Sequence, residues 1–430
     1  MLDTLIKNAV IIPMTERGLV IKGSIGIADG RIACIGPDEP EARETIDARG
    51  HIVMPGLVNA HAHTAMCVMR GYADDYNLKT WLYDKVFPVE ARLDERAIVA
   101  GARLGIAEML ASGTTSFSDM YFCQPAAARE IERIGIKANL CNAVLALSDN
   151  YVFEKDRAVI ETSELIEKYG SKGAVRADVA IHAEYTSPPA IWLRVRDQAK
   201  EHGLITHIHL SETKAEHEEA KGRHGMTAAA AFEKYGVLDG PVLFAHGVWL
   251  EEDDMRIIAS HHASVAHCPV SNLKLGSGMA DVRAMREAGI NVCLGTDGAC
   301  SNNSLDLFEE IKISALLAKG LTLDPTALPA YDVLEMATVN GAIAQGRSDE
   351  TGRLKAGYDA DLIMINTDAA HLRPVYDPIS TVVYSARGSD VELTMVRGRT
   401  LYRDGKWLTL DIGKTVKAVE EYAVPIVKNE

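Results

Sequence analysis

Eight short apolar runs, separated by segments of helical periodicity, fill residues 57–350 and constrain the fold more than any other feature of the sequence. Strands that alternate with helices in this way build a parallel sheet. Eight such units in roughly 290 residues are typical of a closed (β/α)8 barrel of the TIM type, an α/β fold. A doubly wound dinucleotide-binding sheet is disfavoured because no G-x-G-x-x-G motif follows any run. The runs are 57–63, 114–119, 136–144, 177–183, 204–210, 241–246, 264–267 and 290–296.

The two ends of the chain differ from this middle part because their short β-like pieces are broken by glycine and proline. We therefore predict that residues 1–56 and 351–430 pair into one small β-sandwich domain beside a barrel domain of residues 57–350. Helices are expected over 94–112 and 330–344. The β-like pieces are 5–12, 24–28, 31–35, 44–47, 361–365, 382–384 and 393–397.

Charge and cysteine content narrow the choice of partners and compartment. The formal net charge is −15. A protein this acidic has no basic surface for a nucleic acid or an anionic membrane, so we expect a small-molecule substrate. No apolar run is long enough to span a membrane, and the first residues lack the pattern of a signal peptide. The seven cysteines include no C-x-x-C pair, which favours the reducing cytoplasm over a disulfide framework.

The first run of the barrel ends in His61-Ala62-His63. Residues two apart in a strand face the same side, so both imidazoles point into the barrel at its C-terminal rim, where barrel enzymes keep their active sites. Two neutral imidazoles in this arrangement supply half of a divalent metal site. The alternative is a pair of structural histidines that are hydrogen-bonded to other groups.

Three further runs end in similar side chains. His209 ends the fifth run and Glu212 follows in the next loop, while His246 ends the sixth run and Asp297 the eighth. Glu212 alone could equally be a solvated or helix-capping acid. Ligand-type residues at the same end of four strands favour a metal site over separate structural roles. His207 lies one layer deeper and is interpreted as an interior histidine of the packed core.

Six long motifs surround these strand ends: PGLVNAHAHTAM (55–66), MRGYADD (69–75), HIHLSET (207–213), AHGVWL (245–250), HCPVSNLKLGSG (267–278) and LGTDGACSNNSLDLFEE (294–310). They resemble motifs of the amidohydrolase superfamily. The likeness is greatest to the branch of 5′-methylthioadenosine/S-adenosylhomocysteine deaminases and related cytosine, guanine and triazine hydrolases. It spans nearly the whole chain, and it implies that the barrel is a metal-dependent hydrolase domain.

The resemblance also implies a metal site. One divalent ion per chain, zinc with iron as the alternative, would be held by His61, His63, His209 and Asp297. Family members that bridge two metals use a carboxylated lysine on a middle strand. The run 177–183 contains no lysine, so a single ion is favoured.

By the same resemblance, three residues would act in catalysis. Glu212 would be the proton shuttle, His246 would aim the attacking water, and Asp297 would take a proton from it. Glu212 and Asp297 would also contact the substrate. A metal ion lowers the pKa of water from about 15.7 to roughly 7, which explains why such a site can hydrolyse an aminated ring at neutral pH.

Three more residues are implied to bind the substrate. Glu90 falls where deaminases of this branch contact the ribose, His182 where they contact the base, and Arg157 where an arginine meets the polar tail of S-adenosylhomocysteine. Members that bind that tail use a second arginine shortly before, but residues 134–156 hold a leucine, Leu145, in that neighbourhood. A shorter 5′ substituent is therefore favoured.

The expected function is hydrolytic deamination of an adenine nucleoside with a modified 5′ carbon, such as 5′-methylthioadenosine or S-adenosylhomocysteine. The first alternative is a hydrolase of the same fold that acts on another aminated heterocycle of the guanine, cytosine or triazine type. The second is a non-catalytic metal-binding protein. It is disfavoured because all four ligands and Glu212 are present, and a protein that only binds the metal does not need an open coordination position. The expected partners are a purine nucleoside and further copies of the chain in a homo-oligomer, without nucleic acid or membrane.

Overall fold

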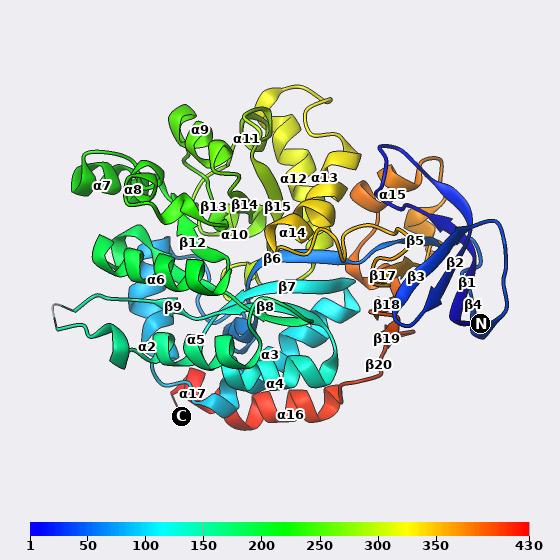
Figure 1. Cartoon of the computed structure of the whole chain (residues 1–430), viewed down its shortest axis with the longest axis horizontal. Helices are drawn as coiled ribbons and strands as arrows, with labels where there is room; N and C mark the ends of the chain where they lie inside the picture. The colour runs from blue at the N-terminus through cyan, green and yellow to red at the C-terminus, as the bar shows by residue number, and fades with distance from the viewer. Residues whose placement is uncertain (149, 430) are drawn as a thin grey trace.

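The computed structural model describes residues 1–148 and 150–429, and it confirms the TIM-type barrel (Figure 1). All eight expected strands form and pair in parallel. Their bounds are β6 (Leu57–His63), β7 (Thr114–Met120), β8 (Lys137–Cys141), β9 (Ala143–Val144), β10 (Val175–Ala177), β11 (Val179–Ala183), β12 (Thr206–Leu210), β13 (Val242–His246), β14 (Ser264–His267), β15 (Asn291–Leu294) and β16 (Asp297–Gly298).

Three of the eight strands are interrupted, so hydrogen bonding divides the barrel into a five-stranded and a six-stranded sheet. The third strand is split into β8 and β9 at Asn142, the fourth into β10 and β11 at Asp178, and the eighth into β15 and β16. In each pair the two halves bond to different neighbours. Because β15 pairs with β14 while β16 pairs with β6, the last strand closes the barrel against the first.

Helices cover the outside of the barrel, and α3 shows how the sequence sets their ends. Asp94 accepts a hydrogen bond from the backbone N of Ala97 at 2.9 Å and caps the first turn. Gly113 follows the helix at a φ of 89°, which glycine adopts without strain. The α-helices up to residue 344, together with the π-helix η2, are α1 (Leu78–Thr80), η2 (Trp81–Val86), α2 (Phe87–Glu90), α3 (Glu95–Ala111), α4 (Gln124–Ile134), α5 (Arg157–Lys168), α6 (Pro189–His202), α7 (Lys214–His224), α8 (Ala228–Lys234), α9 (Glu252–Ser260), α10 (Pro269–Lys274), α11 (Val282–Glu287), α12 (Leu307–Thr322), α13 (Ala330–Ala337) and α14 (Val339–Ala344).

The two ends of the chain meet in one nine-stranded sheet beside the barrel (Figure 1). The N-terminal strand β5 pairs antiparallel with the C-terminal strand β17, with Ile52 opposite Ile365. Buried aliphatic side chains from both ends, such as Ile25, Val53 and Leu393, form a common core. The strands are β1 (Leu2–Ile11), β2 (Ile21–Ala28), β3 (Arg31–Gly36), β4 (Ala42–Asp47), β5 (Ile52–Pro55), β17 (Leu362–Ile365), β18 (Val391–Val396), β19 (Arg399–Arg403) and β20 (Lys406–Trp407).

One expected strand is wrong, because residues 382–384 belong to helix α15 (Pro378–Tyr384). Asp377 caps this helix, Pro378 occupies its first turn, and its buried residues recur at helical spacing. β-branched residues in that stretch favour a strand locally, but the cap and the core position override them. The predicted helix over 330–344 is also divided, at Thr338, into α13 and α14.

The C-terminal residues contain two helices that the sequence pattern did not indicate. They are α16 (Ile412–Tyr422) and α17 (Val424–Lys428). Helix α16 lies along the barrel helix α3 rather than on the terminal sheet (Figure 1). The end of the chain therefore returns from the terminal sheet to the barrel.

A buried ion cluster joins the barrel to the terminal sheet. Lys137, at the start of β8, donates to Asp359 at 2.7 Å and to Asp361 at 2.6 Å. Arg347 lies nearby, equally buried, and donates to the side chain of Asn139 and to three backbone carbonyls. We call Lys137, Arg347, Asp359 and Asp361 the Lys137 cluster, and each of its charged groups has a partner of opposite polarity.

Among the described residues, no helix is long and apolar enough to cross a membrane. All seven cysteines carry free thiols, and six of them are buried.

Candidate metal centre and active site

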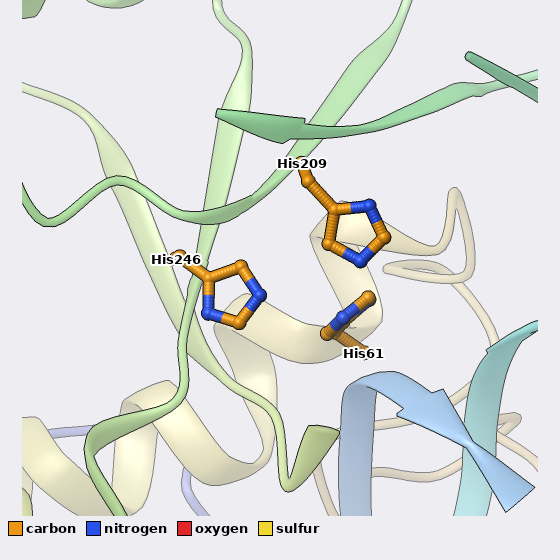
Figure 2. Close-up of side chains that lie close together, drawn as sticks. All are labelled: His61, His209 and His246. Carbon is orange, nitrogen blue, oxygen red and sulfur yellow. The ribbon is translucent and has the colours of Figure 1, made fainter. Parts of the chain in front are cut away.

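Side chains from four strands meet at the C-terminal end of the barrel. His61 and His63 lie on β6, His209 and His246 lie on β12 and β13, and Asp297 begins β16. Figure 2 shows the rings of His61, His209 and His246 facing one common space, and their centroids are 5.0–5.5 Å apart. The structure thus brings together all five side chains predicted at strand ends, which we call the rim cluster.

His63 and His209 each commit one ring nitrogen to a backbone carbonyl. His63 Nδ1 donates to the O of Met120 at 2.5 Å, and His209 Nδ1 donates to the O of His182 at 2.8 Å. Their Nε2 atoms then carry lone pairs, yet these atoms lie only 3.3 Å apart. Two facing lone pairs need a cation between them, and metal-binding histidines commonly donate their other N–H in this way. The donor set therefore fits a divalent metal ion.

Asp297 divides its two oxygens between the histidines and two serines. Its Oδ1 lies 3.3 Å from His61 Nε2 and 3.2 Å from His63 Nε2. Its Oδ2 accepts hydrogen bonds from Ser271 at 2.6 Å and Ser301 at 2.7 Å. Burial alone would raise the pKa of Asp297, but the neighbouring imidazoles of His61 and His63 hold it well below its usual range. The carboxylate is therefore ionised and available as a ligand.

His61 completes the donor set from a deeper position. Its Nδ1 lies 3.0 Å from Nε2 of His207, which confirms His207 as a hydrogen-bonded interior side chain. His61 Nε2 is buried without a hydrogen-bond partner. Within the rim cluster, nitrogen and oxygen atoms close enough to share one ion occur in two sets, and His61 belongs to both. The sets are His61, His209 and His246, and His61, His63 and Asp297.

Glu212 lies beside the rim cluster, in the loop between β12 and α7. Its Oε2 is 3.7 Å from His246 Nε2, and its Oε1 accepts a hydrogen bond from Ser277 at 3.1 Å. The backbone N of Glu212 donates to Glu216 Oε2 at 3.0 Å. Burial raises the pKa of Glu212, which is the direction that a group serving as a proton donor requires.

His246 is held by Asn272, whose Oδ1 lies 2.9 Å from His246 Nδ1. Burial alone would lower the pKa of His246, but the charges of Glu212 and Asp297 raise it above its ordinary value. An imidazole in this environment can donate a hydrogen bond from Nε2 to an oxygen in the cavity.

The backbone itself is bent where these strands end. Ser211, His246 and Asp297 have φ angles of 47°, 72° and 60°. Residues other than glycine adopt this left-handed conformation at a cost of about 1–3 kcal/mol, and such residues are concentrated at active sites. Three bends of this kind turn the ends of β12, β13 and the eighth strand toward the common space.

A cavity opens above the rim cluster, and with its mouth it encloses about 780 Å³. One wall is apolar and comes from α1, η2 and α2, with Leu78, Trp81, Leu82 and Phe87. Among the described residues, no lysine or arginine lines the cavity. The site therefore suits an uncharged, partly aromatic molecule.

Two of the predicted substrate contacts line this cavity. Glu90 stands at the end of α2 close to Tyr121, and burial raises the pKa of Glu90 to about 7. His182 lies one residue before the end of β11, and its Nδ1 is buried without a hydrogen-bond partner. Both positions offer polar atoms to a ligand in an otherwise apolar wall.

The structure does not bring Arg157 to the cavity. Arg157 Nε donates to Glu161 Oε1 and its Nη2 to the Sγ of Cys123, both at 2.6 Å. Glu161 in turn accepts from Asn142, which does line the cavity. Arg157 thus reaches the cavity wall only through two intervening side chains.

The sequence analysis missed several polar groups that touch the site. Ser271, Asn272 and Ser277 reach it from α10 and the loop that follows, and Ser301 reaches it from the loop after β16. All four fall inside motifs quoted for the family resemblance. No local periodicity, however, indicates which of their side chains turn inward.

Comparisons with known proteins agree with this geometry. The Amidohydrolase family model matches residues 52–401. A 5-methylthioadenosine/S-adenosylhomocysteine deaminase of Moorella thermoacetica is 44% identical over 95% of this chain and 96% of its own. A 5′-deoxyadenosine deaminase of Methanosarcina barkeri is 43% identical over 99% of both chains.

Solved structures give the same picture. The crystal structure of an adenosine deaminase from Xanthomonas campestris with bound zinc superposes with a TM-score of 0.95 and 30% identity over 99% of both chains. A match that covers four fifths of the chain, with full-length relatives above 40% identity, is far beyond chance. The chain belongs to the amidohydrolase family.

Proposed function

We propose that the protein is a metal-dependent hydrolytic deaminase, which converts an adenine nucleoside with a modified 5′ carbon to the inosine analogue and ammonia. The observation that carries this proposal is Glu212, whose pKa burial raises, beside His246 at the floor of a cavity that no lysine or arginine lines in the described part of the chain. The full-length relatives named for the deamination of 5-methylthioadenosine, S-adenosylhomocysteine and 5′-deoxyadenosine support it.

His61, His63, His209 and Asp297 would hold one divalent ion, zinc with iron as the alternative. The facing Nε2 atoms of His63 and His209 and the unpartnered Nε2 of His61 support this assignment. When bound, the ion supplies Lewis acidity and lowers the pKa of water to roughly 7. Strand β11 contains no lysine, which supports a single ion rather than two.

The protein's own groups would move the protons. Asp297 takes one proton from the attacking water, and Glu212 gives its proton to the ring nitrogen beside the amino-bearing carbon. Glu212 then collects the proton of the new hydroxyl and passes it to the amine, which leaves as ammonia. The proton on Asp297 restores Glu212. His246 donates from Nε2 to the attacking oxygen and directs it, as in an oxyanion site.

The cavity walls would select the nucleoside. Glu90 accepts hydrogen bonds from the ribose hydroxyls, and His182 contacts the purine base. A charged tail would lie unpaired against apolar side chains, which costs free energy. We therefore propose that 5′-deoxyadenosine and 5′-methylthioadenosine are preferred to S-adenosylhomocysteine.

A panel of adenosine, 5′-deoxyadenosine, 5′-methylthioadenosine, S-adenosylhomocysteine, guanine, cytosine and an aminated triazine, assayed for ammonia release, tests the proposal. We expect the highest kcat/KM for the two nucleosides with short uncharged 5′ groups. Activity confined to guanine, cytosine or the triazine would replace the nucleoside assignment with another aminated heterocycle. The absence of any turnover by metal-loaded protein would favour a non-catalytic role.

We also propose that the chain divides into a composite β-sandwich domain, residues 1–56 and 351–430, and a barrel domain, residues 57–350. The separate aliphatic core of the terminal sheet supports this division. Seven free thiols support a cytoplasmic location. Exposed leucines on α12, such as Leu316 and Leu321, support a homo-oligomer.

A further inference from the structure

One short segment contacts three reacting groups of the site. It consists of α10 and the loop that follows it, up to Ser277. Its Ser271 binds Asp297 and its Asn272 binds His246. Ser277 donates from Oγ to Glu212 Oε1 at 3.1 Å. Among the described residues, this is the only hydrogen bond to the carboxyl group of Glu212.

We propose that Ser277 is a positioning residue that decides which oxygen of Glu212 carries the transferable proton, an inference that rests on the proposed function. When one carboxyl oxygen accepts a hydrogen bond from a hydroxyl group, protonation of the other oxygen is favoured. The proton is therefore kept on Oε2. This is the oxygen that lies 3.7 Å from His246 Nε2, on the side of the rim cluster.

Ser277 can do this because its own position is fixed from three directions. Its backbone N donates to the O of Asn272 at 2.8 Å, and its O accepts from Trp249 Nε1 at 2.7 Å. The next residue, Gly278, has a φ of 133°, and a Cβ atom there would lie 3.0 Å from Trp249 Nε1. Any larger residue at position 278 would be strained at this φ and crowded against the indole of Trp249, so Gly278 is needed for the turn that follows Ser277.

The backbone of Glu212 is fixed as well. Its N donates to Glu216 Oε2, whose other hydrogen bond comes from the N of Thr213. Thr213 and Glu216 cap α7, so the residue enters the cavity from a rigid helix start. These backbone contacts do not fix the side-chain torsions of Glu212, and the hydrogen bond from Ser277 restricts them.

The test begins with Ser277→Ala, assayed on 5′-deoxyadenosine with the metal-loaded full-length protein. A hydrogen bond to an ionisable carboxyl group is lost, so we expect kcat to fall by about 10- to 100-fold while KM changes less than about twofold. Metal content and melting temperature should remain close to those of the wild type. Ser277→Thr keeps the hydroxyl group and should restore most of the rate.

Two further variants separate this role from packing. Ser277→Cys keeps the size of the side chain but donates weakly, so it should also lose rate even if the alanine variant folds poorly. Ser314→Ala removes a buried hydroxyl group on α12, outside the site, and should leave kcat unchanged.

A double-mutant cycle with Glu212→Gln is the decisive measurement, because glutamine has no transferable proton. In that background Ser277→Ala should cause no further loss. The same fold-loss in both backgrounds, or a normal kcat in Ser277→Ala beside an impaired Glu212→Gln, would overturn this inference alone. A Glu212→Gln protein with normal turnover would overturn the proposed proton shuttle, and with it the role of Ser277.

Discussion

Two groups of buried charged and polar side chains, one inside the barrel and one between the barrel and the terminal sheet, differ in how their atoms are paired. In the Lys137 cluster every charged group faces a partner of opposite polarity, with N···O distances of 2.6 and 2.7 Å at the ammonium group. In the rim cluster two imidazole lone pairs face each other at 3.3 Å, and His61 Nε2 has no hydrogen-bond partner.

The difference shows what each group contributes. Unpaired buried polar atoms cost free energy, so a cluster of them that face one another favours a bound group at that place. A fully paired cluster contributes to the stability and uniqueness of the fold and leaves no atom for a ligand. The incomplete pairing of the rim cluster therefore indicates that it binds a ligand.

The largest effect is expected at the rim cluster. His209→Ala removes one of the facing nitrogens, so the protein should lose its bound metal, and activity should fall more than about 1,000-fold. Metal per chain, measured by mass spectrometry, and ammonia release test this together. Without metal the variant should be at least as stable as the wild type. Two ions per wild-type chain, both needed for full rate, would contradict the single-ion site.

The opposite result is expected for the Lys137 cluster. Lys137→Met removes the ammonium group between Asp359 and Asp361 and leaves Asp359 only its longer ion pairs with Arg31 and Arg397. The free energy of unfolding should therefore fall by about 3–5 kcal/mol. Below the unfolding transition, kcat and metal content should stay near the wild-type values. Lys417→Met on the exposed side of α16 is the matched control and should change stability by less than about 0.5 kcal/mol. A loss of rate in Lys137→Met without a loss of stability would show that the Lys137 cluster contributes to function, and would contradict the comparison.

A smaller effect is expected at Glu90, which lines the cavity and belongs to neither the rim cluster nor the Lys137 cluster. Each ribose hydroxyl group that loses its hydrogen bond to Glu90 should lower kcat/KM by about 10–200-fold, as 2′-deoxy analogues would show. Glu90→Ala should abolish the discrimination between 2′-deoxy and ribose nucleosides. Discrimination that survives in this variant would assign sugar recognition to another residue.

The smallest effect is expected at Arg157, whose guanidinium already has partners outside the cavity. Arg157→Ala should change kcat/KM for 5′-methylthioadenosine by less than about threefold, as is usual for a partly exposed ion pair. S-adenosylhomocysteine should gain no advantage in the wild type. A large preference for it that disappears in Arg157→Ala would show that the arginine turns into the cavity when a charged tail is bound.

The sequence predicted the barrel and the rim cluster because both depend on strand ends. Each ligand-type residue stands next to an apolar run, and parallel strands must deliver their C-terminal ends to one rim. His207 was also placed correctly, since period-2 alternation puts it one layer below His209. These inferences need only the order of residues and the geometry of a strand.

Other features depend on contacts between distant residues and could not be predicted. Ser277 and Glu212 are 65 positions apart and meet only because α10 folds back over the rim. The strand expected at 382–384 is a helix because Asp377 caps it and the core accepts its apolar face. Helix α16 was missed because its packing partner, α3, lies in the first third of the chain, far from it in sequence.

The pairing of β5 with β17 also has a consequence for how the protein is made. These strands are adjacent in the terminal sheet but roughly 300 residues apart in the chain. At about 5–20 residues per second, the ribosome releases β17 some 15–60 s after β5. Throughout that interval the barrel grows while one edge of the N-terminal strands stays open. A chain whose synthesis stops after the barrel but before β17 would expose the edge of β5. That edge could then pair with strands of other chains.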